Sequence, residues 1–256
     1  MTIHSSAVIH KDAILAEGVE VGPFTTIGPK ARIGEGTIVG PNVLIEGDTV
    51  IGRNCRIFHG ASLGGEPQIK NFKDVPASLE IGNETVIREY STIHRSGFEN
   101  GVTRIGNGCL LMAYSHVGHD CEIGNEVVIV NSTALSGHVI VEDKAFISGL
   151  VGIHQFVRIG QYAMVGGMAR VNQDILPFST VEGNPAKMFG ANTIGLKRAN
   201  FKPDVRAEIK KALKLIAQPE LNTNQAVEKI EADIKMIDEV QYLVNFIKNS
   251  SRGVTK

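Results

Sequence analysis

A six-residue repeat of aliphatic side chains runs through most of the chain. In steps of six from Ile3 to Val171, each position holds Ile, Leu or Val, with Glu99 as the one exception. Four residues after the aliphatic position there is usually a small residue, such as Ala7 or Ala31. This period matches neither the period of about 3.6 of a helix nor that of about 2 of a single strand. It predicts a short strand followed by a turn, repeated many times.

Three such units close one coil of a triangular prism, about 18 residues long, whose stacked coils pair through parallel strands. The aliphatic residue points inward, and the small residue fits the crowded corner. The 28 glycines, the aromatic content of only 5% and the absence of Trp agree with such a core. We therefore predict a mainly β protein, a parallel β-helix. Three residues in the small inward position are interpreted as buried thiols rather than metal ligands or disulfides: Cys55, Cys109 and Cys121.

Two segments are predicted to leave the prism as loops. Residues 64–80 place Pro67 and Lys73 in the small inward position, which a packed coil should not accept. Residues 95–104 contain the exceptional Glu99. Loops on a rigid scaffold often carry function, so both segments are candidates for substrate contacts.

The repeat stops after Val171, and a different pattern follows. The stretch from Leu176 to Gly195 is rich in Pro and Gly and is interpreted as a connector. Apolar residues with helical spacing then begin at Pro203, near Thr223 and over residues 237–247. We predict a β-helix domain over residues 1–176, and a connector with a C-terminal helical domain over residues 177–256.

Composition excludes several classes of partner. The formal net charge is −1, which gives no general attraction to nucleic acid or to an anionic membrane. The first residues lack the charged and apolar regions of a signal peptide. No apolar run reaches the roughly 18–20 residues that span a bilayer. We expect a cytoplasmic protein without a membrane span.

Several histidines fall one coil apart. His119, His138 and His154 lie in hexads that begin at residues 117, 135 and 153, and Gly137 follows His119 by one coil. We expect these residues on one flank, with His116 just before it. A neutral His can take a proton from a hydroxyl near pH 7, and a backbone N–H can stabilise an oxyanion. The pattern indicates acyl transfer from a thioester.

Zinc is the alternative for the histidine cluster. Trimeric β-helix carbonic anhydrases resemble this fold and hold zinc with three histidines between subunits, and His116 with His119 could contribute here. However, Asp120, Gln155 and Gly137 accompany the histidines and suit proton transfer better. We expect no metal and no cofactor of the enzyme's own.

Longer motifs resemble one family in particular. They are His116-Val-Gly-His119-Asp120-Cys121, Leu135-Ser-Gly137-His138, Ile153-His154-Gln155-Phe156, Glu182-Gly183-Asn184-Pro185 and Gly195-Leu196-Lys197-Arg198. The segment from Ile87 to Arg95 and the C-terminal Ser251-Arg252-Gly253 also match. The chain resembles the hexapeptide-repeat UDP-N-acetylglucosamine acyltransferases that begin lipid A biosynthesis, over nearly its whole length. This resemblance implies left-handed coils and a homotrimer with active sites between subunits.

The resemblance also implies an activity. A 3-hydroxyacyl group would move from the phosphopantetheine of acyl carrier protein to the 3-position of UDP-N-acetylglucosamine. His119 would be the general base, Asp120 would orient it, and the Gly137 amide would form the oxyanion hole. Substrate contacts would come from His116, His138, His154, Gln155, Gln68, Lys70, Asn192 and Arg198. Gly167 and Met168 would set the acyl-chain length. The acidic carrier protein would dock on Lys187, Lys197, Arg198, Lys202 and Arg206.

Three departures from the family pattern affect the sugar nucleotide. The family's sugar-contacting loop carries an Asp that is missing from Pro67-Gln68-Ile69-Lys70, unless Asp74 replaces it. Ile194 and Ala199 stand where an acidic residue and a second Arg are common. A UDP-sugar with a 3-amino group is therefore a second candidate acceptor. The sequence also leaves open a different hexapeptide-repeat acyltransferase, a zinc lyase, or a non-catalytic scaffold, which the clustered histidines disfavour.

Overall fold

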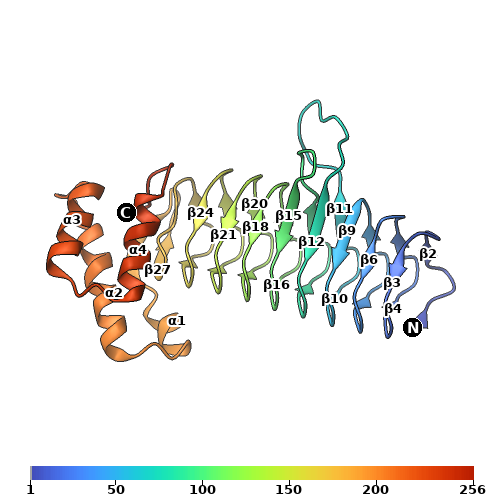
Figure 1. Cartoon of the computed structure of the whole chain (residues 1–256), viewed down its shortest axis with the longest axis horizontal. Coiled ribbons are helices and arrows are strands. Elements are labelled where there is room, and N and C mark those ends of the chain that lie inside the picture. Colours follow the sequence, from blue (N-terminus) through green and yellow to red (C-terminus); the bar gives the residue numbers. More distant parts are fainter. Residues whose placement is uncertain (1) are drawn as a thin grey trace.

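The computed structural model describes residues 2–256 as a long prism of short parallel strands that ends in a group of helices (Figure 1). Three sheets form the three faces. Successive strands belong to successive faces, so strand neighbours within a face lie one coil apart in sequence. For example, Thr2 pairs with Glu20, and His116 pairs with Ala134. The predicted parallel β-helix is confirmed.

The strand bounds are as follows. The first sheet contains, in order, β1 (Thr2–Ile3), β4 (Glu20–Val21), β7 (Ile38–Val39), β10 (Arg56–Ile57), β13 (Val86–Ile87), β16 (Leu110–Leu111), β19 (Val128–Ile129), β22 (Phe146–Ile147), β25 (Met164–Val165), β27 (Ser179–Glu182) and β28 (Lys187–Ala191). The second contains β2 (Val8–Ile9), β5 (Thr26–Ile27), β8 (Leu44–Ile45), β11 (Ser62–Gly65), β14 (Thr92–His94), β17 (His116–Val117), β20 (Ala134–Leu135), β23 (Gly152–Ile153) and β26 (Arg170–Val171). The third contains β3 (Ile14–Leu15), β6 (Arg32–Ile33), β9 (Asp48–Ile51), β12 (Ser78–Ile81), β15 (Val102–Ile105), β18 (Glu122–Ile123), β21 (Ile140–Val141) and β24 (Arg158–Ile159).

The six-residue repeat explains the core. Beyond the first coil, the aliphatic residues of the repeat that lie in strands are buried, and Ile45 and Leu135 have no exposed surface. The small residue four positions later is buried as well, and the three cysteines lie there as free thiols. Burial raises the pKa of Cys121 to about 12, so this thiol stays protonated at neutral pH.

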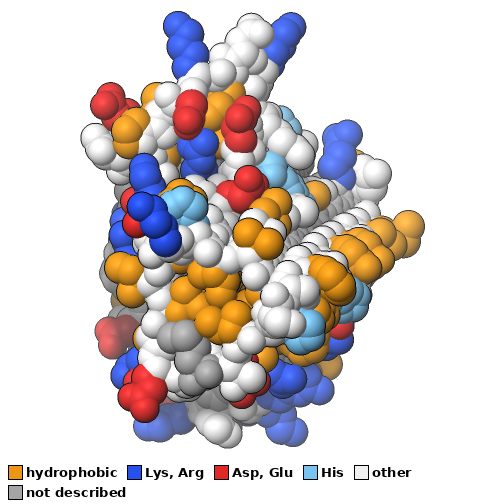
Figure 2. All heavy atoms as spheres, turned by 90° about the vertical axis from the view of Figure 1, so that its right-hand side faces the viewer, with side chains coloured by type: hydrophobic (Ala, Val, Ile, Leu, Met, Phe, Trp, Pro, Cys, Tyr) orange, Lys and Arg blue, Asp and Glu red, His pale blue; other side chains and the backbone are white. Residues whose placement is uncertain are grey.

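The first coil is the exception, because no coil covers its outer side. Ile3 is 43% exposed, and Ile9 and Leu15 are only partly buried. Figure 2 looks at this end of the prism, where hydrophobic side chains reach the surface.

Two insertions project from the same side of the prism (Figure 1). Within the second sheet, Ser62 pairs with Thr92 and Thr92 with His116, whereas uninterrupted coils pair residues 18 apart. The first insertion therefore adds two hexads and the second adds one. Whole hexads keep the repeat in phase, which is why Ile69 and Val75 match the pattern although both lie in a loop and are only half-buried. The loops occupy residues 66–77 and 95–101, slightly less than expected.

The helices follow the prism as α1 (Thr193–Arg198), α2 (Pro203–Ile216), α3 (Thr223–Asp233) and α4 (Asp238–Lys248). The last three confirm the predicted helical segments. Their apolar faces form a second core with Leu176 and Phe178 from the end of the prism. Within residues 2–256, no helix is both long and apolar enough to cross a membrane.

The interpretation of residues 176–195 as a plain connector was wrong in part. This stretch contains β27, which extends the first sheet, and β28, which pairs with it antiparallel, and α1 begins at Thr193. The division of the chain at residue 176 stays a prediction. The C-terminal tail returns to the prism, where the buried Asp174 pairs with Val254 and accepts a hydrogen bond from the Ser250 hydroxyl at 2.7 Å.

Candidate functional site

His119 and Asp120 form a hydrogen-bonded pair at the corner after β17. His119 Nδ1 lies 2.6 Å from Asp120 Oδ2. A carboxylate only accepts, so in the neutral form of His119 the proton is on Nδ1 and the lone pair is on Nε2. Asp120 is itself held in place: its oxygens accept from the Ser96 hydroxyl and from the Gly97 N–H, at 3.2 Å for the latter, and its own N–H donates to Thr103 Oγ1 at 2.8 Å.

Gly137 lies against the His119 ring from the next coil. A Cβ added to Gly137 would stand 2.6 Å from His119 Nε2 and 2.5 Å from its Cε1, so only glycine fits without moving the ring. The Gly137 N–H has no acceptor within the part of the chain described, residues 2–256. His119 Nε2 therefore lies next to a residue whose N–H is free to donate.

His138 covers the other side of this pair. Its ring meets the His119 ring edge to face, with centroids 5.2 Å apart, and its Nε2 lies 3.9 Å from Asp120 Oδ2. The ring also stacks on Phe156 at 4.5 Å and contacts Phe98 at 5.5 Å. Burial is the main cause that lowers the pKa of His138, with Asp120 opposing the shift. His138 is thus neutral at pH 7.

A second histidine pair lies on the adjoining face of the second sheet. His116 Nδ1 lies 2.8 Å from Thr92 Oγ1, and its ring meets His94 edge to face at 5.0 Å. Burial holds the pKa of His94 at about 4, and burial also lowers the pKa of His116. The Nδ1 atom of His94 is buried and has no hydrogen-bond partner within residues 2–256.

His154 lies one coil beyond Ser136 and is tied to the C-terminal tail. Arg252 Nη2 is 3.2 Å from His154 Nδ1 and also donates to the Asn172 carbonyl at 3.3 Å. The backbone carbonyl of Gln155 lies 3.1 Å from the same Nδ1. His154, Arg252, Arg170 and Asn172 line an open groove of about 550 Å³. Arg170 and Arg252 give this groove a positive charge. Ser136, the residue before Gly137, also lines it.

The first loop approaches the His119–Asp120 pair through Ile69. A Cβ on Gly97 would stand 2.5 Å from Ile69 Cδ1 and 3.7 Å from His119 Nδ1. Gln68 and Lys70 flank Ile69 and are exposed. Asp74, the possible replacement for the missing acidic residue, pairs instead with Arg95 at 2.8 Å.

Asn192 and Arg198 line a different cavity, of about 510 Å³, with Phe146, Met164 and Ile194. The Asn192 amide is already in use: Oδ1 caps α1 at Gly195 N, and Nδ2 donates to the Tyr162 carbonyl, both at 2.9 Å. Gly167 and Met168 lie exposed at another corner, with 72% of Met168 exposed. One chain therefore does not bring these predicted residues together with His119.

Sequence reasoning missed several residues that complete the site. Ser96, Gly97 and Thr103 hold Asp120, yet no local motif marks them. Two facts could have indicated Ser96: it comes 24 residues before Asp120, and the insertion between them adds one hexad, so both take the same corner position. In the sequence, Arg252 stands out only within the matching C-terminal segment Ser251-Arg252-Gly253, and His94 only within the matching segment from Ile87 to Arg95.

Three groups of the site could also face a metal ion. One ligand atom from each of His119, Asp120 and His138 lies within 4.8 Å of the other two. However, the Asp120 oxygens already accept hydrogen bonds from Ser96, Gly97 and His119. These hydrogen bonds suit a His–Asp pair that transfers a proton. The expectation that the site holds no metal stays a prediction.

Comparisons with known proteins agree on one family. Residues 174–255 match the model described as UDP N-acetylglucosamine O-acyltransferase, domain 2, and residues 30–65 and 103–137 match the bacterial transferase hexapeptide model. The acyl-(acyl-carrier-protein)–UDP-N-acetylglucosamine O-acyltransferase of Alkalilimnicola ehrlichii is 45% identical over 99% of both chains. The enzyme of that name from Gloeothece citriformis is 50% identical over 77% of this chain and 71% of its own.

Solved structures give the same result. The UDP-N-acetylglucosamine acyltransferase of Francisella novicida superposes with a TM-score of 0.95 at 38% identity, covering 99% of this chain and 94% of its own. LpxA from Acinetobacter baumannii gives a TM-score of 0.95 at 36% identity over the whole of both chains. These likenesses extend through the prism and the helices alike.

Proposed function

The chain belongs to the UDP-N-acetylglucosamine O-acyltransferase family, the left-handed β-helix acyltransferases of lipid A biosynthesis, and from this premise we propose that His119 is its general base. The enzyme transfers an acyl group from acyl carrier protein to UDP-N-acetylglucosamine, the first step of lipid A biosynthesis. One observation carries the assignment of the base: His119 Nε2 lies directly beside the Gly137 α-carbon while Nδ1 is bonded to Asp120.

The proposed reaction proceeds without a covalent enzyme intermediate. His119 Nε2 removes the proton of the sugar 3-hydroxyl while its oxygen attacks the thioester carbonyl carbon. The carbonyl oxygen gains negative charge, which the Gly137 N–H stabilises. As the tetrahedral intermediate collapses, the carbon–sulfur bond breaks, and the His119 imidazolium returns its proton to the phosphopantetheine thiolate. The products are the acylated sugar nucleotide and free carrier-protein thiol.

Asp120 supports this role in two ways. It fixes the tautomer with the lone pair on Nε2, and its negative charge stabilises the imidazolium that forms during attack. His138 stays neutral and hydrogen-bonds substrate. In this proposal His116, His154 and Gln155 contact the sugar nucleotide or the acyl chain, and Gln68 and Lys70 contact the acceptor sugar.

We further propose that the active enzyme is a homotrimer with sites between subunits. In support of this, Asn192 and Arg198 line a cavity that His119 does not line. A neighbouring subunit would bring this cavity, with Gly167 and Met168, to the catalytic pair. The basic residues near α1 and α2 would dock the acidic carrier protein, and the reaction would take place in the cytoplasm.

The acceptor atom on the sugar is either a 3-hydroxyl oxygen or a 3-amino nitrogen. Ile194 replaces a common acidic residue, and Asp74 is paired with Arg95, so the sugar pocket departs from the family pattern. A UDP-sugar with a 3-amino group is therefore the second candidate acceptor. Side-by-side turnover of the 3-hydroxy and 3-amino sugars decides between them, and a strong preference for the hydroxyl form removes the amino candidate.

The test of the proposed function uses the purified full chain. We expect acyl transfer from 3-hydroxyacyl carrier protein to UDP-N-acetylglucosamine, with size-exclusion chromatography and light scattering reporting a trimer. No transfer to either sugar nucleotide, or stoichiometric zinc in the active protein, would contradict the proposal.

A further inference from the structure

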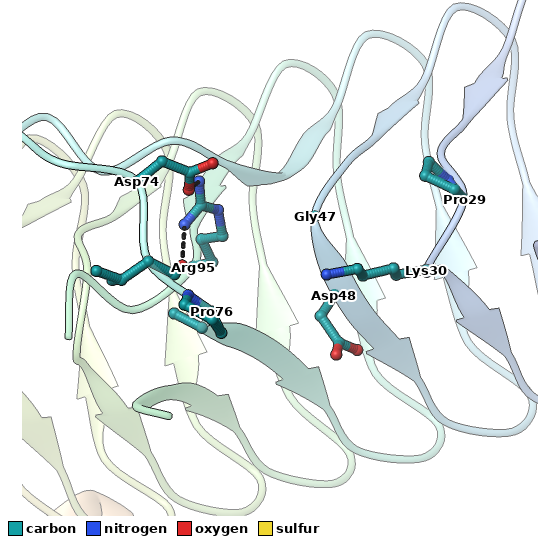
Figure 3. Close-up of a pocket in the computed structure, with 9 residues that line it drawn as sticks. Pro29, Lys30, Gly47, Asp48, Asp74, Pro76 and Arg95 are labelled. Atoms are coloured by element: carbon teal, nitrogen blue, oxygen red, sulfur yellow. Dashed lines mark hydrogen bonds and ion pairs between the residues drawn. The ribbon is translucent and has the colours of Figure 1, made fainter. Parts of the chain in front are cut away.

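Arg95 has an unusual position for a charged residue. It follows β14 directly, and only 11% of its side chain is exposed. It lies beneath the first loop, residues 66–77, at one wall of a pocket of about 300 Å³ (Figure 3). The reaction proposed above gives it no role.

The guanidinium binds the loop at three places. Nη2 donates to Asp74 Oδ1 at 2.8 Å, and Nη1 donates to the Val75 carbonyl at 3.4 Å. The group also lies over the Phe72 ring, 5.5 Å from its centroid. Figure 3 shows Asp74 and Arg95 side by side, with Lys30 and Asp48 across the pocket.

The loop has few other hydrogen bonds to the prism within residues 2–256. It forms no strand within the described residues, and Lys70, Asn71 and Lys73 are exposed. Pro67 is buried at its start, and the Pro76 carbonyl accepts from Asn100 N at its end. Ordering such a segment costs conformational entropy, which the contacts of Arg95 offset.

The same short segment also holds the catalytic pair. Arg95 N donates to the Gly65 carbonyl at 3.2 Å at the base of the loop. The next two residues, Ser96 and Gly97, donate to the Asp120 carboxylate. Ile69 packs on Gly97, so the loop lies beside the segment that holds Asp120, whose hydrogen bonds do not involve the Arg95 side chain.

We propose that Arg95 is a positioning residue for acceptor specificity: it fixes the first loop so that Gln68 and Lys70, on either side of Ile69, face the sugar beside His119. The proposal rests on the proposed function for the identity of the sugar. It does not require Arg95 itself to touch substrate.

The primary test is Arg95→Ala, compared with Arg32→Ala. Arg32 makes an ion pair of similar length with Asp48, at 2.7 Å, and no hydrogen bond or ion pair within residues 2–256 links it to the loop. For Arg95→Ala we expect the KM for UDP-N-acetylglucosamine to rise about tenfold, the scale of losing a hydrogen bond to a charged group. The kcat and the KM for acyl carrier protein should stay near wild type, as should every constant of Arg32→Ala.

Limited proteolysis measures how often the first loop opens in the absence of substrate. Trypsin cuts after Lys70 and Lys73, both exposed, and its rate follows local opening. Cleavage there should be faster in Arg95→Ala than in wild type and unchanged in Arg32→Ala. Arg95→Lys, which keeps charge but not the fork of donors, should fall between wild type and Arg95→Ala.

Asp74→Ala breaks the same ion pair from the exposed side. We expect it to fold normally, because 81% of the Asp74 side chain is exposed. It should raise the same KM and the same cleavage rate, and the double variant with Arg95→Ala should be no worse than Arg95→Ala alone. Wild-type cleavage rates and an unchanged sugar KM in both single variants would overturn the proposal. If the wild-type enzyme has no transferase activity, the proposed function is contradicted. The proteolysis rates still test whether Arg95 fixes the loop.

Discussion

The His119 ring lies so close to the α-carbon of Gly137 that a methyl group there would come within 2.6 Å of Nε2. The clashing atoms belong to a side chain that can rotate, so Gly137→Ala should displace the base and leave the fold intact. We expect kcat to fall by about 10²–10⁴, the usual contribution of a positioned general base, because the backbone N–H at residue 137 is kept. Steady-state kinetics with thermal unfolding checks this. Full activity in the variant would show that the contact is not catalytic.

Asp120 should control the tautomer of His119. Asp120→Asn removes the negative charge that stabilises the imidazolium, and an amide that turns its NH2 group toward Nδ1 would also place the proton on Nε2 and remove the base. A loss of about 10²–10⁴ in kcat is expected for such a change. The pH–rate profile of the residual activity should differ from that of wild type. Retention of more than a tenth of wild-type kcat would contradict this role.

Ser96 should have a smaller effect through the same carboxylate. Ser96→Ala removes one of the hydrogen bonds to Asp120 but leaves those from Gly97 and His119. We expect kcat to fall about three- to tenfold, with substrate KM values close to wild type. A loss as large as that of Asp120→Asn would mean that Ser96 takes part directly.

His94 should make stability depend on pH. Its pKa is about 4 in the folded protein and 6.5 in the reference state, chiefly because the ring is buried. Between these values the unfolded chain binds the extra proton, so stability rises with pH through this window and is lost as pH falls from about 6.5 to 4. After a discount for partial exposure, the effect is on the order of 1 kcal/mol.

The measurement is urea unfolding at pH 5 and pH 7.5 for wild type and His94→Phe. The variant cannot titrate at this position, so its stability should change less between the two pH values. An equal pH dependence in both proteins would show that His94 does not contribute.

The repeat made much of this molecule predictable. A fixed coil length placed Gly137 one coil after His119, and the structure has the two in contact. The inward cysteines and the three longer helices follow equally from local patterns. The prediction that His154 lies on the same flank as His119 and His138 was less accurate. His154 is the second residue of its hexad, His119 the third and His138 the fourth, so His154 lies on a face and bonds with Arg252.

Contacts across the insertions could not be predicted in the same way. Counting coils from Asp120 back to Ser96 requires the number of inserted hexads, and whole-hexad insertions leave no break in phase. The bond between Arg252 and His154 joins residues 98 apart and depends on how the tail folds back. The pairing of Arg95 with Asp74 depends on the path of a loop that has no repeat of its own.

The central claim is that His119 is the general base. The most direct test is the rate of acyl transfer from 3-hydroxyacyl carrier protein to UDP-N-acetylglucosamine by wild type and by His119→Ala, with circular dichroism to verify the fold. The account predicts a fall in kcat of about 10²–10⁴, the usual contribution of a positioned general base. A folded His119→Ala enzyme with wild-type kcat would contradict it.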